Sequence, residues 1–75
     1  MKVKLDRKSN AAYIYLTSIR PGGVAHSYPC DPLEVDGMIN LDFDRDGRLI
    51  GIEVLDASHK LPATLLAEAE RSGSE

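Results

Sequence analysis

The sequence predicts an α+β fold, in which an antiparallel β-meander of four to five strands is followed by one C-terminal α-helix. Three observations support this prediction. Short segments that alternate apolar and polar residues fill most of the chain up to residue 55, as half-buried strands do. Residues typical of turns separate these segments. After residue 61, helix-forming residues place apolar side chains three and four positions apart.

The first two strands are expected at Lys2–Asp6 and Ala11–Ile19, joined by the polar turn 7–10. The second segment is rich in residues that favour strands. Alternation along it directs the aliphatic side chains toward the core and places Tyr13 and Tyr15 on the opposite face.

The middle of the chain is predicted to contain one weaker strand and a loop. A Pro-Gly-Gly sequence at 21–23 marks a turn, and Val24–Tyr28 follows it as the expected third strand. Two prolines bracket segment 29–32, so we expect a loop there. The sequence leaves open whether residues 24–35 hold one strand or two.

The clearest element is a hairpin over residues 39–55, with Asp46 and Gly47 as its turn. Asp-Gly between alternating apolar residues is typical of a two-residue type I′ turn, in which both central residues have positive φ. The register that follows pairs Arg45 with Arg48, Asp44 with Leu49, Phe43 with Ile50, and Asp42 with Gly51. It places six apolar residues on one face: Ile39, Leu41, Phe43, Ile50, Ile52 and Val54.

The C-terminal part is predicted to leave the sheet and form the helix. Pro62 suits the first position of a helix, because its missing N–H has no partner there in any case. A helix over Ala63–Arg71 is too short to be stable alone, so it must dock on the sheet or on a partner chain. Residues 1–71 are therefore expected to form one small domain, with 72–75 as a disordered tail.

Composition and charge narrow the classes of function. The net charge of −3 disfavours nucleic-acid binding, which usually needs a basic patch, and suits a basic protein partner. No apolar run is long enough to span a membrane, and the N-terminus lacks the apolar region of a signal peptide. A single cysteine forms no internal disulfide, which favours the cytoplasm. A small core and free sheet edges predict a homodimer.

One segment of the hairpin matches a calcium-binding pattern. Asp42, Asp44, Asp46, Gly47 and Glu53 fit the EF-hand loop, whose oxygen ligands suit a hard cation. An EF-hand needs a helix on each side of its loop, whereas both flanks here have the alternation and β-branched residues of strands. Calcium binding by Asp42, Asp44, Asp46 and Glu53 is therefore the alternative hypothesis, and a solvated hairpin face is the favoured one.

Catalytic and zinc sites have little support in the sequence. Cys30 with His26 or His59 resembles a nucleophile and base, but nothing close in sequence indicates a lowered thiol pKa. The same three residues lack a recognised zinc spacing. Because no nucleophile is paired with a base, we expect a protein that is not an enzyme and has no cofactor.

The face of the sheet opposite the core is the predicted partner-binding surface. Tyrosines two positions apart on a strand often anchor protein interfaces, and Tyr13 and Tyr15 have this spacing. Asp42, Asp44 and Glu53 are expected on the same face, where they would attract a basic protein.

Two segments also resemble a known family: Tyr13–Leu16 and Ile39–Ser58. The specific part is the Asp-Gly hairpin that runs into Gly51–Glu53 and Asp56–Ala57. From Lys2 to about Leu66 the chain is similar to the YuzE-like family of small bacterial proteins, which is domain of unknown function family 2283. The chain departs from the family at residues 10–12 and in loop 29–37. The resemblance implies an α+β fold and no assigned activity. Members of the family are encoded beside small proteins with a toxin-like fold. The resemblance therefore implies an antitoxin-like role with a small basic toxin-like partner.

Overall fold

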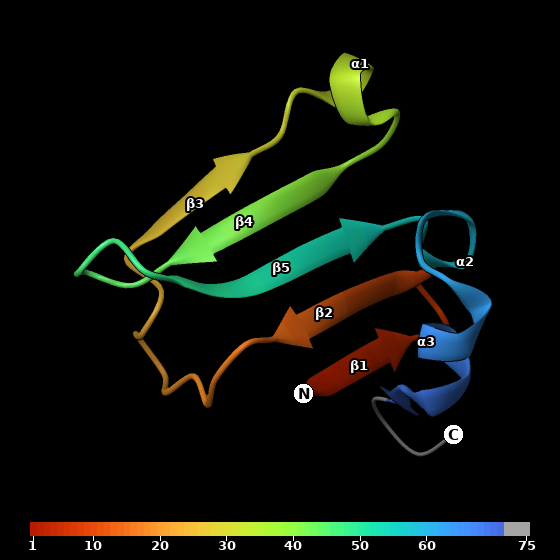
Figure 1. The fold of residues 1–75 in the computed structure, drawn as a ribbon, viewed down its shortest axis with the longest axis horizontal. Helices are drawn as coiled ribbons and strands as arrows, with labels where there is room; N and C mark the ends of the chain where they lie inside the picture. The colour runs from red at the N-terminus through yellow and green to blue at the C-terminus, as the bar shows by residue number, and fades with distance from the viewer. Residues whose placement is uncertain (72–75) are drawn as a thin grey trace.

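The α+β prediction is confirmed by a computed structural model, which describes residues 1–71 (Figure 1). One broad sheet has short helices at one of its ends. The expected disordered tail at 72–75 lies outside the described residues. The strands are β1 (Lys2–Asp6), β2 (Ala11–Tyr15), β3 (His26–Pro29), β4 (Ile39–Phe43), β5 (Leu49–Leu55) and β6 (Glu70–Arg71). The helices are α1 (Pro32–Val35), α2 (Ala57–Lys60) and α3 (Ala63–Glu68).

The strand order differs from the predicted meander. The order is β3-β4-β5-β2-β1-β6, so β2 lies beside β5 instead of β3. Strands β1 to β5 pair antiparallel, and the two-residue β6 pairs parallel to β1. Connection 16–25 carries the chain from β2 past two strands to the far edge, which gives β2-β5-β4-β3 a Greek-key order. All four residues of β3 are exposed, which suits an edge strand, whereas the longer and more apolar β5 takes the centre.

The hairpin turn is longer than predicted. The N–H of Gly47 donates to the carbonyl of Asp44 at 3.0 Å, and the N–H of Asp44 donates to the carbonyl of Arg48 at 2.9 Å. Residues 45–47 therefore form a three-residue loop, and Gly47 is its only residue with positive φ, at 83°. This is the hairpin in which a residue with positive φ follows a type I turn, so the prediction of a type I′ turn was wrong.

A bulge in β5 compensates for the longer loop. Phe43 faces Leu49 instead of the predicted Ile50, and Ile50 is the extra residue of β5 at this point. Asp42 nevertheless faces Gly51 as predicted, and the predicted register holds from there to the other end of β4. An odd number of loop residues shifts one strand by one position, and the bulge takes up that shift.

Three short helices replace the single predicted one. α1 lies in the segment predicted as loop, where the side chain of Asp31 accepts from the N–H of Leu33 at 2.9 Å and Pro32 begins the helix. α2 follows β5 directly. α3 ends at Glu68 instead of Arg71, because Ala69 is extended and the chain then pairs with β1. No helix of the described residues is long and apolar enough to cross a membrane.

The core lies under one half of the sheet. Val3, Ala12 and Ala57 are its buried centre, and apolar residues of β1, β2, α3 and the residues directly after α2 and α3 pack around them. In Figure 1 α2 and α3 lie at the end of the sheet where β5 and β1 finish, and α1 lies at the same end, beyond β3 and β4. The helices therefore leave the apolar side of β3, β4 and β5 without a covering layer from the described chain.

Candidate interaction site

The two sides of the sheet have opposite chemistry. Register pairs place Lys2, Tyr15, Gly51, Asp42 and Ser27 in one row across five strands. The neighbouring positions on each strand face the other side and are aliphatic or aromatic, except for the imidazole of His26 at the edge of the sheet. Two candidate surfaces follow from this arrangement, a polar face and an apolar face.

On the polar face, Asp42 is the centre of a hydrogen-bonded cluster. Its Oδ2 accepts from the hydroxyl of Tyr13 at 2.5 Å, and its Oδ1 accepts from the hydroxyl of Ser27 at 2.6 Å. Asp42 is 9% exposed. Both of its oxygens are therefore engaged within the chain, and the carboxylate is a structural acceptor.

The environment of Tyr13 favours its neutral form. Burial raises its pKa above the ordinary value, and the hydrogen bond to Asp42 and the charge of Asp42 raise it further. A neutral hydroxyl donates to the carboxylate, whereas a phenolate would repel it. The pair is therefore stable only while Tyr13 keeps its proton.

The other predicted residues of this face are also engaged. Glu53 accepts from the side-chain amide of Asn40 at 2.9 Å. Tyr15 packs edge-on against Tyr13, with ring centroids 4.8 Å apart, and the ammonium of Lys2 lies 5.1 Å from the Tyr15 ring centroid. The structure thus brings Tyr13, Tyr15, Asp42 and Glu53 onto one face, but hydrogen bonds tie the polar groups of Tyr13, Asp42 and Glu53 to other residues of the chain.

The two remaining residues of the calcium pattern lie in the turn. Oδ1 of Asp44 accepts from the N–H groups of Asp46 and Arg48, both at 2.9 Å. The carboxylate of Asp46 lies 3.8 Å from the guanidinium of Arg48 in an exposed ion pair. Among residues 1–71 no group of three or more acidic, histidine or cysteine side chains is placed to hold a metal ion. Asp42, Asp44, Asp46 and Glu53 therefore do not converge.

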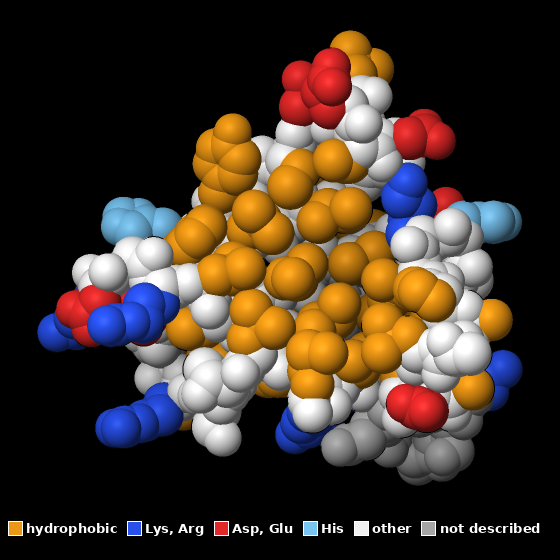
Figure 2. All heavy atoms as spheres, in the orientation of Figure 1, with side chains coloured by type: hydrophobic (Ala, Val, Ile, Leu, Met, Phe, Trp, Pro, Cys, Tyr) orange, Lys and Arg blue, Asp and Glu red, His pale blue; other side chains and the backbone are white. Residues whose placement is uncertain are grey.

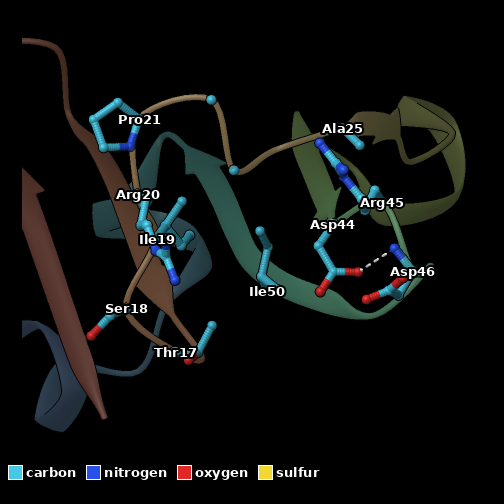
Figure 3. Close-up of a pocket in the computed structure, with 12 residues that line it drawn as sticks. Thr17, Ser18, Ile19, Arg20, Pro21, Ala25, Asp44, Arg45, Asp46 and Ile50 are labelled. Atoms are coloured by element: carbon cyan, nitrogen blue, oxygen red, sulfur yellow. Dashed lines mark hydrogen bonds between the residues drawn. The ribbon is translucent and has the colours of Figure 1, made fainter.

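A hollow of about 520 Å³ lies between connection 16–25 and the hairpin turn (Figure 3). Arg20 stands on one wall, Arg45 and Asp44 on the other, with Ile50 between the two walls. The oxygen of Asp44 that faces the turn already bonds to the N–H of Asp46. Because side chains of both charges line the hollow, it offers no preference for an anion or a cation.

The residues weighed for catalysis or zinc are dispersed. Cys30 follows β3, half-buried, and its N–H donates to the carbonyl of Ile39 at 2.8 Å. His26 begins β3 and is exposed. His59 lies on α2, where its Nδ1 is 2.9 Å from the carboxylate of Asp56. That hydrogen bond, and then the charge of Asp56, raise the pKa of His59.

Two linking contacts were missed by the sequence prediction. The side chain of Asn10 donates to Asp56 at 3.2 Å and to the hydroxyl of Ser58 at 3.0 Å, and accepts from the N–H of Ser58 at 3.1 Å. Asn10 and Asp56 both have φ of 55°. Asn and Asp are the non-glycine residues that most often adopt this conformation. That preference was the available signal, but it did not indicate that the two turns would meet.

The second missed contact holds α1 in place. The ammonium of Lys60 donates to the carbonyls of Val35 and Asp36, both at 2.8 Å. Asp36 ends α1 with φ of 52°, a left-handed cap. Lys60 therefore fixes the end of α1 to α2 across the corner of the molecule.

The corner that Lys60 supports presents an apolar residue among acidic ones. Leu33 of α1 is 91% exposed. Asp31, Glu34 and Asp36 surround it in sequence, and all three are exposed. Figure 2 shows acidic and hydrophobic side chains together over α1. We call residues 31–36 the acidic tip.

The apolar side of the sheet forms one continuous patch. In Figure 2 hydrophobic side chains cover the middle of the broad side, over β3, β4 and β5. Register pairs place Tyr28 beside Leu41 and Leu41 beside Ile52, and they also pair Ile39 with Val54 and Phe43 with Leu49. Tyr28 is 61% and Leu49 37% exposed, and the others are half-buried, apart from the buried Val54. We define the open face as Tyr28, Ile39, Leu41, Phe43, Leu49 and Ile52.

Comparison with known proteins gives one match. A family model described as "Protein of unknown function (DUF2283)" matches residues 2–58, which confirms the family that the hairpin segment resembled. Neither the curated proteins nor the solved structures contain a match to the chain.

Proposed function

This chain belongs to the DUF2283 family of proteins of unknown function, and we propose that it is a cytoplasmic protein-interaction module with an antitoxin-like role. In this proposal it binds a basic protein partner and acts by binding instead of catalysis. The single observation that supports an interaction module is the open face, which is apolar and has no covering layer from the described chain.

An uncovered apolar face indicates binding because it is costly to leave in water. Soluble monomers rarely expose contiguous apolar patches larger than a few hundred Å², and larger patches mark interaction sites. The six residues of the open face lie on three adjacent strands, so their patch is continuous. Single exposed apolar residues are common on proteins, but a whole sheet face is not.

The charge of the molecule supports a basic partner. The net charge is −3, and the three acidic residues of the acidic tip are exposed, although Asp31 also caps α1. On the polar face, by contrast, Asp42 and Glu53 already accept hydrogen bonds within the chain. The acidic tip, and not the polar face named by the sequence prediction, is therefore the better candidate to meet lysines or arginines of a partner.

Leu33 adds an apolar anchor to the acidic tip. Interfaces draw most of their binding energy from a few well-packed side chains, and rigid placement lowers the entropy cost of binding. Leu33 is held by the Asp31 cap on one side of α1 and by the Lys60 bonds on the other. The expected partner surface is thus an apolar pocket with a basic rim.

Affinity purification from the native host, followed by reconstitution with the purified partner, tests this function. Glu34→Lys should weaken binding of a basic partner and reduce its dependence on salt, because it reverses a charge in the acidic tip. Glu68→Lys on α3 is the matched control, because it makes the same charge change outside the tip. Equal binding by both variants, or no stoichiometric partner in repeated purifications, would count against the proposal.

A further inference from the structure

We propose that the open face binds the open face of a second copy of this chain, so that two sheets pack face to face in a symmetric dimer. This inference rests on the proposed function, because it names the occupant of the surface that marks the chain as an interaction module. It leaves the acidic tip of each copy available for a different partner.

The chemistry of the open face favours a second copy over a basic protein. Its six side chains are aliphatic or aromatic, and none carries a carboxylate that could pair with a lysine or arginine. His26 faces Phe43 in register at the edge of the sheet, where its side chain is exposed. Removing a formal charge from water would be costly, and two such faces can bury apolar surface against each other without doing so.

The dimensions of the molecule suit such a contact. It measures 33 × 31 Å across its broad side and 19 Å through its thickness. Each partner in a standard interface contributes about 800 Å², which is most of a side of these dimensions, so the contact would extend from the open face over the residues around it. A twofold axis uses the same patch on both copies, so one surface is enough to build the interface.

The core of the single chain gives an independent reason for the second layer. Its buried hydrophobic residues are only Val3, Ala12, Ile50, Val54 and Ala57, and no large side chain within residues 1–71 falls below 2% exposure. Domains are built from at least two packed layers, and β3, β4 and β5 form one. Oligomerisation is a common solution for chains of this size. A second sheet packed about 10 Å away would complete the core.

The test is the mass of the protein in solution, measured by light scattering and sedimentation at micromolar concentration. The wild type should have twice the mass of one chain. Leu41→Glu, which places a charge in the centre of the open face, should give the mass of one chain. Leu33→Glu is the matched control, because it makes the same substitution on the acidic tip and should leave the dimer intact.

A second variant guards against simple unfolding. Tyr28 is 61% exposed in the single chain, so Tyr28→Glu should leave the fold intact, as circular dichroism can confirm, and still weaken the dimer. A monomeric wild type, or a dimer whose mass neither Leu41→Glu nor Tyr28→Glu reduces, would overturn the inference. If a monomeric wild type still bound a partner, and Glu34→Lys abolished that binding, the dimer would be refuted and the proposed function would stand. If the wild type were a dimer but bound no other protein, the proposed function would be refuted and the dimer would stand.

Discussion

The hydroxyl of Tyr13 on β2 donates to the carboxylate of Asp42 on β4 across the whole width of β5, which separates these two strands. This reach is possible because the residue of β5 that faces Asp42 is Gly51. A Cβ atom at Gly51 would lie 2.0 Å from the Tyr13 hydroxyl oxygen. The polar face is thus organised around a tyrosine that lies over a glycine and bonds to a buried carboxylate.

Tyr13→Phe should lower the free energy of unfolding by about 1–3 kcal/mol, because it removes a hydrogen-bond donor from a buried carboxylate. Urea denaturation measures the change. Tyr15→Phe is the matched control, since that variant leaves both hydrogen bonds to Asp42 in place. The same loss in both variants would mean that the Tyr13–Asp42 bond has no special role.

The same pair also predicts how stability changes at high pH. The native state raises the pKa of Tyr13 above its ordinary value of about 10. A group whose pKa is raised on folding contributes stability that is complete below its unfolded pKa and is lost as the pH rises toward the folded pKa. Above about pH 10, stability should therefore fall more steeply in the wild type than in Tyr13→Phe.

Gly51→Ala should destabilise the fold by about 1–3 kcal/mol through overpacking. The added methyl group would force the Tyr13 ring off β5 and break its bond to Asp42. A double-mutant cycle with Tyr13→Phe measures this coupling. Because Gly51→Ala already displaces the Tyr13 hydroxyl, the double variant should lose less stability than the sum of the two single losses. A loss in the double variant equal to that sum would contradict the mechanism.

The sequence predicted the part of the fold that local chemistry determines. Alternation predicted four to five antiparallel strands, with residues 24–35 left open between one strand and two, and the apolar pattern placed Asp42 opposite Gly51. Strand order could not be predicted in the same way, because β2 and β5 pair through contacts far apart in sequence. The bulge at Ile50 and the three-residue loop compensate for each other, so the apolar pattern was compatible with both versions of the turn.

The candidate surfaces were predictable only in part. Alternation correctly placed Tyr13 and Tyr15 opposite the aliphatic residues of β2, but it does not show which polar groups will satisfy one another. The acidic tip was missed because two prolines near residue 30 indicated a loop. Its rigidity depends on Lys60, which is 24 residues from Asp36 in sequence.

His59 should titrate above its ordinary pKa of about 6.5, and Asp56→Asn should lower that pKa. The hydrogen bond to the Asp56 carboxylate favours the protonated ring. The contribution of this hydrogen bond to stability is therefore present below the pKa of His59 in the unfolded state. It is lost as the pH rises through the pKa of His59 in the folded state. Titration of the His59 ring protons by NMR measures the pKa. An unchanged value in Asp56→Asn would show that this contact does not persist in solution.

Lys60→Met should loosen the acidic tip without unfolding the sheet. Methionine keeps most of the aliphatic stem but loses the ammonium that bonds to the carbonyls of Val35 and Asp36. We expect a loss on the order of 1 kcal/mol in the local opening free energy, seen as faster amide hydrogen exchange over residues 33–38. Lys8→Met, at an exposed lysine in the turn between β1 and β2, should leave exchange in this segment unchanged.

Millimolar Ca²⁺ should leave the melting temperature unchanged, although the hairpin matches the EF-hand pattern. Calcium needs six to eight oxygen ligands around one point. Here Asp42 is bonded to Tyr13 and Ser27, and Asp44 accepts two backbone N–H groups of the turn. Gathering these oxygens around a cation would break the hairpin that presents them. A rise in melting temperature with Ca²⁺ that Asp44→Asn abolishes, with magnesium as the comparison ion, would show that the hairpin rearranges to bind the metal.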